Sequence, residues 1–263
     1  MTTLAIHGAA GQMGRRLVAL ATDDARFEVV GAIEYAGHDA MGTDAGLLAH
    51  GGAIGVPLTE TITVRPDVII DFSTPTGTRL AIASALEHGS GLVVGTTGLQ
   101  AQDHASIDAA GERIAVLQAP NMSLGVNLLF DLAAQAAARL GDAYDIEIVE
   151  SHHRYKKDAP SGTALGIAEA VCRATGKSID EDVVHGRHGD DVPRQPGQIG
   201  MHALRLGDLA GRHTISFATL GEEVQLTHIA TTRDVFARGA LTAAAWLAGR
   251  EAARYRMTDV LGL

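Results

Sequence analysis

The stretch TLAIHGAAGQMGRRLVALATDD, residues 3–24, predicts how the first part of the chain folds. It opens with a short apolar run, passes through Gly8, Gly11 and Gly14, and continues with the apolar spacing of a helix. A second apolar run, FEVVGAIE, ends in Glu34, twenty residues beyond Gly14. A strand, a glycine turn, a helix and a strand ending in an acid are together typical of a dinucleotide-binding unit.

Each part of this arrangement has a physical task. Glycines let the backbone approach a pyrophosphate, the helix N-terminus faces it, and the acid binds ribose hydroxyls. The spacing here is G-x-x-G-x-x-G rather than G-x-G-x-x-G. The bare motif is therefore also compatible with a glycine-rich turn that binds no ligand.

The residues after Glu34 bear on the choice of cofactor. An NADP site needs a cation near the 2′-phosphate, but Tyr35 comes next and no Lys or Arg appears before Arg65. Glu34 would itself repel a phosphate. We therefore expect NADH to be used at least as well as NADPH. Arg15 and Arg16 are the cations that could swing toward the adenosine end.

Strand and helix patterns alternate as far as about residue 123. We expect strands at 67–73, 91–98 and 113–123, the last two running into loops, and helices at 76–89 and 101–111. Residues 44–60 are expected to form a loop. The alternation predicts a mostly parallel sheet with right-handed crossovers. Ligands bind at the carboxyl ends of such strands, where residues 95–97 and 119–122 fall.

The pattern changes after residue 123, which suggests a second domain. LGVNLLFDLAAQAAARL, residues 124–140, is apolar on nearly every face and predicts a helix buried between layers. We expect a strand at 144–152, a helix at 163–175, a hairpin at 214–231 and a final helix at 233–250 that returns to the first domain. Residues 185–212 are expected to form a long loop with one strand near 199–206, and such loops are often functional.

A second motif, ESHHRYKKDAPSGTAL, occupies residues 150–165. The chain has a formal charge of −10, yet two histidines, one arginine and two lysines fall between His152 and Lys157. Imidazoles exchange protons near neutral pH, and backbone N–H groups at a helix start bind anions. The motif predicts a cradle for a small anion with proton donors beside it. By itself it is equally compatible with a solvated basic loop before an ordinary helix cap.

Composition narrows the class of protein. The acidic balance argues against nonspecific nucleic-acid binding, and the lack of eighteen consecutive apolar residues argues against a membrane span. The N-terminus lacks the pattern of a signal peptide. Cys172 is the only cysteine, so we expect a buried thiol and a cytosolic protein. No metal is expected on His152 and His153, because neighbouring strand residues point to opposite faces.

With both motifs placed, the sequence resembles the dihydrodipicolinate reductase family over essentially the whole chain. The resemblance is carried by GAAGQMG at 8–14, Glu34, GTTG at 95–98, APNMSLGVN at 119–127 and the motif at 150–165. It implies an α/β fold with an N-terminal Rossmann dinucleotide-binding domain, residues 1–123 and 233–263. It also implies a C-terminal α+β substrate-binding and oligomerisation domain, residues 124–232, with a mixed open sheet that assembles a homotetramer.

The resemblance also implies the reaction and its residues. The family reduces a cyclic dicarboxylic imine, 4-hydroxy-tetrahydrodipicolinate or dihydrodipicolinate, to tetrahydrodipicolinate with a hydride from NAD(P)H, in lysine and diaminopimelate biosynthesis. His152 and Lys156 would handle the proton, with Lys156 as the acid and His152 as donor or relay. The dicarboxylate substrate would be bound by His153, Ser161, Gly162 and Thr163. The cofactor-binding site would be lined by Gly8, Ala9, Ala10, Gly11, Gln12, Met13, Gly14, Glu34, Gly95, Thr96, Thr97, Ala119, Pro120, Asn121 and Met122.

One departure from the family pattern favours NADH. Many members carry arginine where Gln12 and Tyr35 stand here. Two alternatives stay open on the sequence alone, another Rossmann amino-acid or sugar dehydrogenase and a nonenzymatic NAD-binding sensor. Neither needs the titratable cluster beside the Ser-Gly-Thr turn. Glu150 is expected to pair with a nearby cation.

Overall fold

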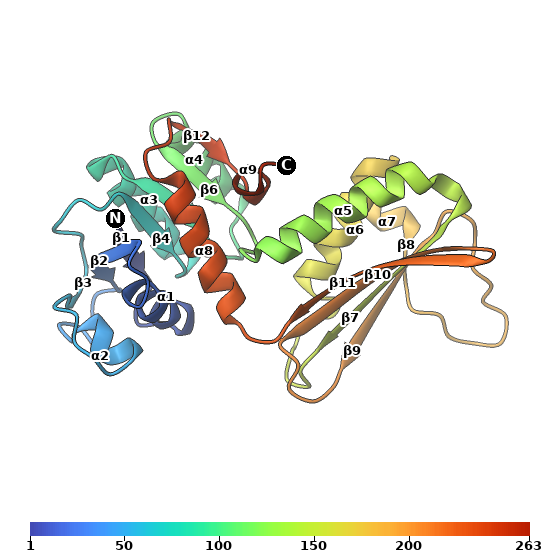
Figure 1. The fold of residues 1–263 in the computed structure, drawn as a ribbon, viewed down its shortest axis with the longest axis horizontal. Coiled ribbons are helices and arrows are strands. Elements are labelled where there is room, and N and C mark those ends of the chain that lie inside the picture. The colour runs from blue at the N-terminus through green and yellow to red at the C-terminus, as the bar shows by residue number, and fades with distance from the viewer. The chain divides into compact units, whose positions relative to one another are not determined.

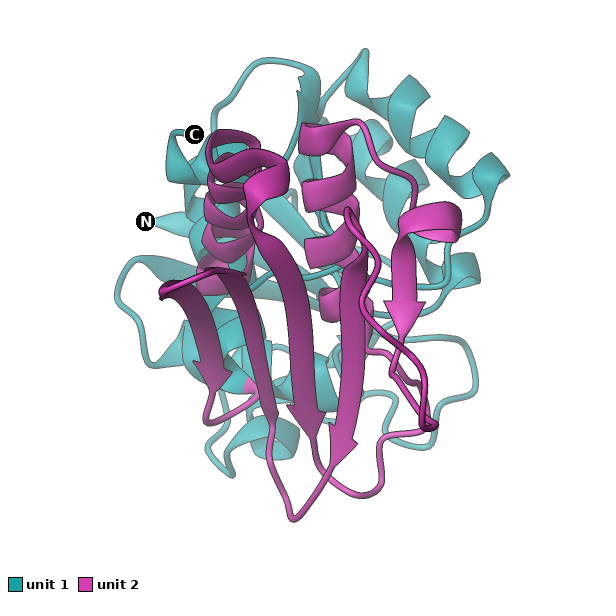
Figure 2. Ribbon diagram, turned by 90° about the vertical axis from the view of Figure 1, so that its right-hand side faces the viewer, with its two compact units in different colours: residues 1–123, 234–263 teal, residues 124–233 magenta.

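The structure, a computed structural model, describes all 263 residues and divides into two units. Unit 1 comprises residues 1–123 and 234–263, and unit 2 comprises residues 124–233 (Figures 1 and 2). The boundaries differ only at Arg233 from the domains expected from the sequence.

Unit 1 is built on a seven-stranded parallel sheet with the order β12-β6-β5-β4-β1-β2-β3. Its strands are β1 (Thr2–His7), β2 (Phe27–Ile33), β3 (Leu58–Thr59), β4 (Val68–Asp71), β5 (Gly91–Val94), β6 (Ala115–Gln118) and β12 (Ala253–Tyr255). Leu4, Ala5 and Ile6 of β1 are fully buried, as expected of a central parallel strand covered on both faces. The parallel sheet and its Rossmann-like strand order confirm the expected fold class.

Helices cover the sheet of unit 1 (Figure 1). They are α1 (Gln12–Thr22), α2 (Ala45–Ala49), α3 (Pro75–His88), α4 (Ala101–Gly111), α8 (Asp234–Leu247) and α9 (Met257–Leu261). Helix α8 packs against α1 and against β4, β5 and β6, so the late helix returns to the first unit. Helix α3 packs on β4 and β5, and α4 packs on β6 and β12.

Unit 2 is a mixed five-stranded sheet in the order β11-β10-β7-β9-β8, with β7, β8 and β9 parallel and β10 and β11 antiparallel. Its strands are β7 (Asp145–His152), β8 (Val183–His185), β9 (Ile199–Arg205), β10 (Gly211–Thr219) and β11 (Glu222–Ala230). Its helices are α5 (Leu124–Leu140), the short 3-10 helix η1 (Gly141–Ala143), α6 (Gly162–Thr175) and α7 (Ile179–Asp182). The two long helices, α5 and α6, lie on one face of the sheet (Figure 2).

Several local expectations were wrong. Helix α5 has the predicted bounds but is not buried on all sides, because Leu128 and Leu132 are each 40% exposed. Residues 44–60 contain α2 and β3, and the carboxylate of Asp44 caps α2 by accepting the N–H groups of Gly46 and Leu47. Strands β8 and β12 and the short helices α7 and α9 were not expected. No helix is long and apolar enough to cross a membrane.

Candidate active site

The glycine turn after β1 is shaped by close backbone contacts. Gly8 has φ +80°, and a Cβ atom there would lie 2.6 Å from the carbonyl oxygen of Phe72. A Cβ atom at Gly14 would lie 2.1 Å from the carbonyl oxygen of Gly8. Gly11 caps α1 without a side-chain hydrogen bond, and the first turn of α1 contains no acid. The N-terminal N–H groups of α1 therefore meet no competing carboxylate from their own turn, which suits a pyrophosphate.

The acidic residue expected to bind ribose lies beside this turn. One carboxylate oxygen of Glu34 accepts the N–H of Ala10 at 3.1 Å, and the other accepts the N–H of Tyr35 at 3.1 Å. Arg16 is held in an ion pair with Asp234, with donor-to-oxygen distances of 2.8 and 2.6 Å. Arg16 is therefore paired with Asp234, and the residue that follows Glu34 is the uncharged Tyr35.

Arg15 differs from Arg16 because it stays beside the turn. Its Nε atom donates to the carbonyl oxygen of Ala10 at 2.7 Å, on the residue whose N–H is held by Glu34. Of the two arginines considered from the sequence, Arg15 is the one that contacts the glycine turn, at the residue that Glu34 also contacts.

The other predicted cofactor residues follow the carboxyl ends of β5 and β6. Gly95, Thr96 and Thr97 come after β5, and Ala119, Pro120, Asn121 and Met122 come after β6. Ala119 N–H donates to the carbonyl oxygen of Val94 at 3.2 Å, which links the two loops. All predicted cofactor residues therefore lie in unit 1 at the carboxyl edge of its sheet. The strand order reverses between β1 and β4 at this edge, where open α/β sheets bind ligands.

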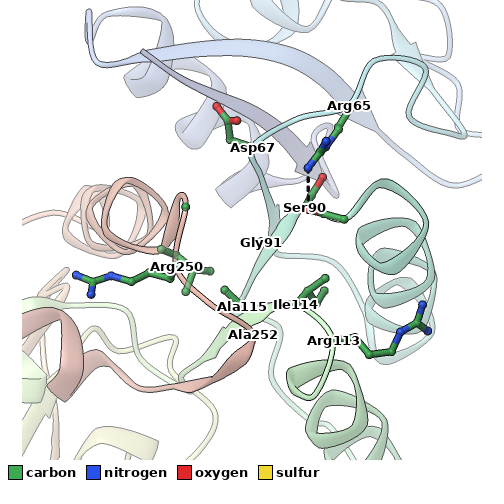
Figure 3. Close-up of a pocket in the computed structure, with 12 residues that line it drawn as sticks. Arg65, Asp67, Ser90, Gly91, Arg113, Ile114, Ala115, Arg250 and Ala252 are labelled. Carbon is green, nitrogen blue, oxygen red and sulfur yellow. Dashed lines mark hydrogen bonds between the residues drawn. The ribbon is translucent and has the colours of Figure 1, made fainter.

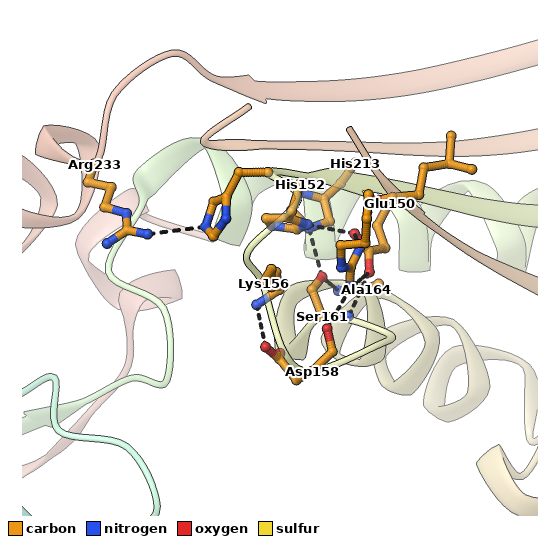
Figure 4. Close-up of polar contacts among 11 residues, drawn as sticks. Glu150, His152, Lys156, Asp158, Ser161, Ala164, His213 and Arg233 are labelled. Carbon is orange, nitrogen blue, oxygen red and sulfur yellow. Dashed lines mark hydrogen bonds and ion pairs between the residues drawn. The ribbon is translucent and has the colours of Figure 1, made fainter. Parts of the chain in front are cut away.

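In unit 2, a buried carboxylate organises the second motif (Figure 4). Glu150 has no exposed surface and accepts four hydrogen bonds. Two come from the guanidinium of Arg205 at 2.9 and 2.8 Å, one from Nδ1 of His152 at 2.5 Å and one from the N–H of Ser161 at 3.0 Å. Glu150 therefore pairs with a cation, as expected, and also joins β7, β9 and the start of α6.

The charge states of this pair follow from burial and hydrogen bonding. Burial opposes ionisation of Glu150, but the hydrogen bonds from Arg205 and His152 outweigh it and lower the pKa of the carboxyl. Burial lowers the pKa of His152 below its ordinary value, and the neighbouring Glu150 opposes this shift only in part. An ionised Glu150 accepting from Nδ1 leaves Nε2 of His152 as the position for proton exchange.

His213 is a site residue that the sequence did not point to. It is 4% exposed, its Nε2 lies 3.0 Å from the hydroxyl oxygen of Ser161, and its ring stands edge-on to His152 with centroids 5.0 Å apart. Burial lowers the pKa of His213 to about 3, so the ring is neutral near pH 7. Nothing in the local sequence of β10 marks this residue; only the pairing of β10 with β7 brings it to the site.

Ser161 is held by the protein's own groups. Its hydroxyl oxygen accepts the N–H of Ala164 at 3.2 Å as the cap of α6, and its backbone N–H is held by Glu150. Ser161 is 2% exposed, whereas Gly162 is exposed and Thr163 is half-buried. Of the three predicted substrate residues at this helix start, Gly162 and Thr163 are the accessible ones.

The remaining residues of the motif sit on the loop between β7 and α6. The Lys156 ammonium is 2.8 Å from a carboxylate oxygen of Asp158, which lowers the pKa of that carboxyl through a hydrogen bond. Nε2 of His153 lies 3.3 Å from the guanidinium of Arg233 (Figure 4). Arg205 also donates to the carbonyl oxygen of Asp158, so the cation that pairs with Glu150 anchors this loop.

A cavity of 340 Å³ lies at the opposite, amino edge of the sheet of unit 1 (Figure 3). Arg65, Arg113 and Arg250 line it, but their charged groups do not converge. Arg250 stacks on Trp246 with its guanidinium 4.0 Å from the ring centroid, and Arg65 donates to the carbonyl oxygen of Gly89. A binding site needs polar groups that converge on a ligand, so this cavity is not the candidate site.

Two further expectations concern metals and the thiol. The structure contains no group of three or more His, Cys, Asp or Glu side chains placed to hold a metal ion. Cys172 is 3% exposed, and burial raises the pKa of its thiol. Cys172 is thus the buried apolar residue predicted from the sequence, and it is unsuited to nucleophilic chemistry.

Comparison with known proteins gives one family for both units. The family model described as dihydrodipicolinate reductase, N-terminus, matches residues 2–122. The model described as dihydrodipicolinate reductase, C-terminus, matches residues 125–261. Together the two models span nearly all of the chain.

Relatives and solved structures agree with these matches. The 4-hydroxy-tetrahydrodipicolinate reductase of Burkholderia multivorans is 45% identical over 263 residues, covering 99% of each chain. The enzyme of the same name from Chromohalobacter salexigens is 46% identical over 267 residues, covering 100% of this chain and 99% of its own. A dipicolinate-bound dihydrodipicolinate reductase from Paenisporosarcina sp. TG-14 has the same fold, with a TM-score of 0.78, 23% identity and 98% coverage of each chain.

Proposed function

The chain belongs to the dihydrodipicolinate reductase family, and on that premise we propose that it converts 4-hydroxy-tetrahydrodipicolinate to tetrahydrodipicolinate. The substrate loses its hydroxyl as water, which gives dihydrodipicolinate, and a hydride from NAD(P)H and a proton then reduce the ring. The chain is an oxidoreductase of lysine and diaminopimelate biosynthesis. Membership of this family decides against another Rossmann amino-acid or sugar dehydrogenase. A nonenzymatic sensor is the alternative that a turnover experiment excludes.

The observation that carries the proposal is the network around Glu150. A dicarboxylate substrate needs anion-binding groups and a proton donor within one site. Glu150 ties His152 to the start of α6 through Ser161, and Arg205 ties the same carboxylate to the loop that carries Lys156. The proton donor and the anion-binding helix start are thereby held in fixed positions relative to each other, and such fixed geometry lowers the barrier of a reaction.

The residues of unit 2 divide the work between binding and protonation. We assign one substrate carboxylate to the N-terminus of α6 at Gly162 and Thr163, where backbone dipoles favour an anion. His153 contacts the other carboxylate. Ser161 stabilises the start of α6 rather than binding the substrate, because its hydroxyl oxygen already accepts the N–H of Ala164 and its own N–H already donates to Glu150.

The proton comes from the basic motif. Lys156 donates the proton that the reduced ring requires, and His152 acts as second donor or relay through Nε2. Asp158, whose carboxylate oxygen lies 2.8 Å from the Lys156 ammonium, holds the side chain of Lys156 in place on the loop between β7 and α6. The cofactor supplies the hydride when it is bound.

The residues of unit 1 fit a nicotinamide dinucleotide. At Gly8 and Gly14 the neighbouring backbone lies so near that a Cβ atom at either position would collide with a carbonyl oxygen. The pyrophosphate is assigned to the start of α1, and the adenosine ribose to Glu34. NADH is the proposed preferred or equal cofactor, because Gln12 and Tyr35 supply no charge and Arg16 is paired with Asp234.

We further propose a cytoplasmic homotetramer. The face of the unit 2 sheet opposite α5 and α6 carries exposed Leu204 and Ile229, at 47% and 51% exposure, beside hydroxyl-bearing Thr214 and Thr227. Such a face suits burial against other copies of the chain. Light scattering on the purified protein tests this, and a monomeric mass at micromolar concentration would contradict it.

Steady-state kinetics test the function. The purified protein is given 4-hydroxy-tetrahydrodipicolinate, made in the assay by dihydrodipicolinate synthase, with either NADH or NADPH. We expect substrate-dependent oxidation, with kcat/KM for NADH equal to or above that for NADPH. A clear preference for NADPH would keep the reaction but remove the cofactor assignment, and Arg15→Ala would then show whether Arg15 holds the phosphate. A folded protein that binds NADH but turns over nothing would refute the reaction.

A further inference from the structure

Unit 1 contains a second fully buried carboxylate network that the proposed reaction does not use. Asp71, the last residue of β4, has no exposed surface. One of its oxygens accepts the hydroxyl of Ser73 at 2.5 Å, and the other accepts the hydroxyls of Thr78 at 2.6 Å and Thr96 at 2.8 Å. Nδ1 of His7 lies 3.4 Å from the first oxygen.

These partners come from four separate segments of the chain. His7 is the residue before the glycine turn, Ser73 lies in the turn after β4, Thr78 lies in the first turn of α3, and Thr96 lies in the loop after β5. A carboxylate buried in this way is costly unless its lone pairs are filled by donors. Asp71 therefore fixes the four segments in one arrangement, because any movement leaves an unsatisfied buried charge.

The network also orders the loop after β5. Since the hydroxyl of Thr96 donates to Asp71, its oxygen is left as an acceptor, and it accepts the N–H of Ser73 at 2.9 Å. The N–H of Gly95 donates to the carbonyl oxygen of Asp71 at 2.9 Å. Asp71 thus holds residues 95–97 through both its side chain and its backbone.

The position of the network in the sheet identifies which part of a dinucleotide it serves. Glu34, after β2, lies on one side of the glycine turn and takes the adenosine ribose in the proposed function. Strands β4 and β5 lie on the other side of β1. A dinucleotide crossing the carboxyl edge between β1 and β4 therefore places its nicotinamide half over the ends of β4 and β5.

We infer that Asp71 is a positioning residue for the nicotinamide half of the cofactor. It acts through Ser73 and Thr96, whose hydroxyls it holds, and through the loop 95–97 that these hydroxyls fix. Asp71 itself is covered by the protein and does not contact the cofactor. The inference rests on the proposed function only for the identity of the cofactor.

Binding of NADH and ADP to the full-length protein without substrate tests the inference. ADP carries the adenosine and the pyrophosphate but no nicotinamide. In Asp71→Asn the amide nitrogen faces hydroxyls that are already donors, so the network must rearrange. We expect the Kd for NADH to rise about ten- to a hundredfold, because NADH binding must then restore the order of residues 95–97, and an ordering cost equal to one hydrogen bond to a charged group raises Kd by that factor. The Kd for ADP should stay within about twofold of wild type, since the hydrogen bonds of the Asp71 side chain come from Ser73, Thr78 and Thr96 and none comes from the glycine turn or Glu34.

The matched control is Asp103→Asn. Asp103 is also fully buried in unit 1, but its partners are Arg79 and the N–H of Gln100 at the start of α4. Asp103→Asn should leave the Kd for NADH unchanged. If it weakens NADH as much as Asp71→Asn does, or if Asp71→Asn weakens ADP as much as NADH, the inference is overturned in favour of a general loss of order.

A second pair of variants covers the case in which Asp71→Asn does not fold. Thr96→Val keeps the shape of the side chain and removes the hydroxyl, whereas Thr96→Ser keeps the hydroxyl. We expect weakened NADH binding in the first and near-wild-type binding in the second. Equal affinities in the two variants would overturn the inference. The wild-type protein separates this result from a failure of the proposed reaction, because it would still bind NADH while showing no turnover.

Discussion

Replacing Glu150 by glutamine should affect both stability and catalysis. Glu150 is the acceptor in all four of its hydrogen bonds, which come from Arg205, His152 and Ser161. Glutamine keeps one acceptor oxygen but turns an NH2 group toward the other donors. Arg205, whose side chain is 19% exposed, loses its anionic partner. Breaking a buried ion pair costs about 3–5 kcal/mol, and partial hydration of Arg205 places the expected loss near 3 kcal/mol.

The catalytic effect has a different origin from the loss of stability. Without the carboxylate, Nδ1 of His152 is no longer fixed as the donor, so both the ring orientation and the tautomer become variable. We expect kcat to fall about 10²–10³-fold, within the range for general acid–base groups. Loss of the carboxylate should also lower the pKa of His152 further. Any limb of the pH profile that needs protonated His152 then moves to lower pH.

Urea unfolding and pH-dependent kinetics on the same preparations separate the two effects. Ile199→Ala is the control, because Ile199 is fully buried at the far end of β9 and truncating it costs about 2–5 kcal/mol without touching the network. We expect the control to lose stability and keep kcat. If Glu150→Gln kept wild-type kcat, or Ile199→Ala lost as much activity, the positioning role of Glu150 would be refuted.

Three further substitutions test the proton donor, the buried histidine and the glycine turn. Lys156→Ala should lower kcat about 10²–10⁴-fold with a smaller change in KM, and a variant with nearly full kcat in steady-state assays would remove Lys156 as the acid. His213→Gln should flatten the pH dependence of stability. The native pKa of about 3 lies below the unfolded value of 6.5, so the unfolded state binds the proton first and wild-type stability falls as pH drops from 6.5 toward 3. Urea unfolding at pH 7 and pH 5 should show a loss about 2 kcal/mol smaller in the variant, and an unchanged loss would mean that His213 is not buried as a neutral ring. Gly14→Ala should weaken NADH binding and lower Tm, because the new Cβ would lie 2.1 Å from the carbonyl oxygen of Gly8, and wild-type binding by calorimetry would contradict this close packing.

Local sequence patterns were sufficient for most elements of the fold. The alternation of apolar runs and glycines predicted β1, α1 and β2, and the bounds of α5 were predicted to the residue, because these signals lie within one short stretch of chain. The prediction that α5 is buried on all sides was wrong. Composition shows which residues are apolar but not how many faces of the helix other elements cover. Leu128 and Leu132 stay partly exposed on the side away from α6 and the sheet.

The buried networks could not be predicted, because their members are far apart in sequence. Glu150 meets Arg205 only because β7 and β9 pair in a parallel register that places His152 opposite Arg205. His213 reaches Ser161 only because β10 runs antiparallel to β7. The sequence alone pointed to the residues of the family motif, including the pairing of Glu150 with a cation, but not to Arg205 and His213, which carry no local signal.

The fate of the transferred hydrogen shows whether this protein catalyses the proposed reduction. The wild-type protein would be given 4-hydroxy-tetrahydrodipicolinate and NADH carrying deuterium on both hydrogens of its reactive ring carbon, and the product analysed by mass spectrometry. We expect tetrahydrodipicolinate carrying one deuterium per molecule, formed in step with NADH oxidation. Product without deuterium, or NADH oxidation that does not depend on the substrate, would refute the proposed reaction.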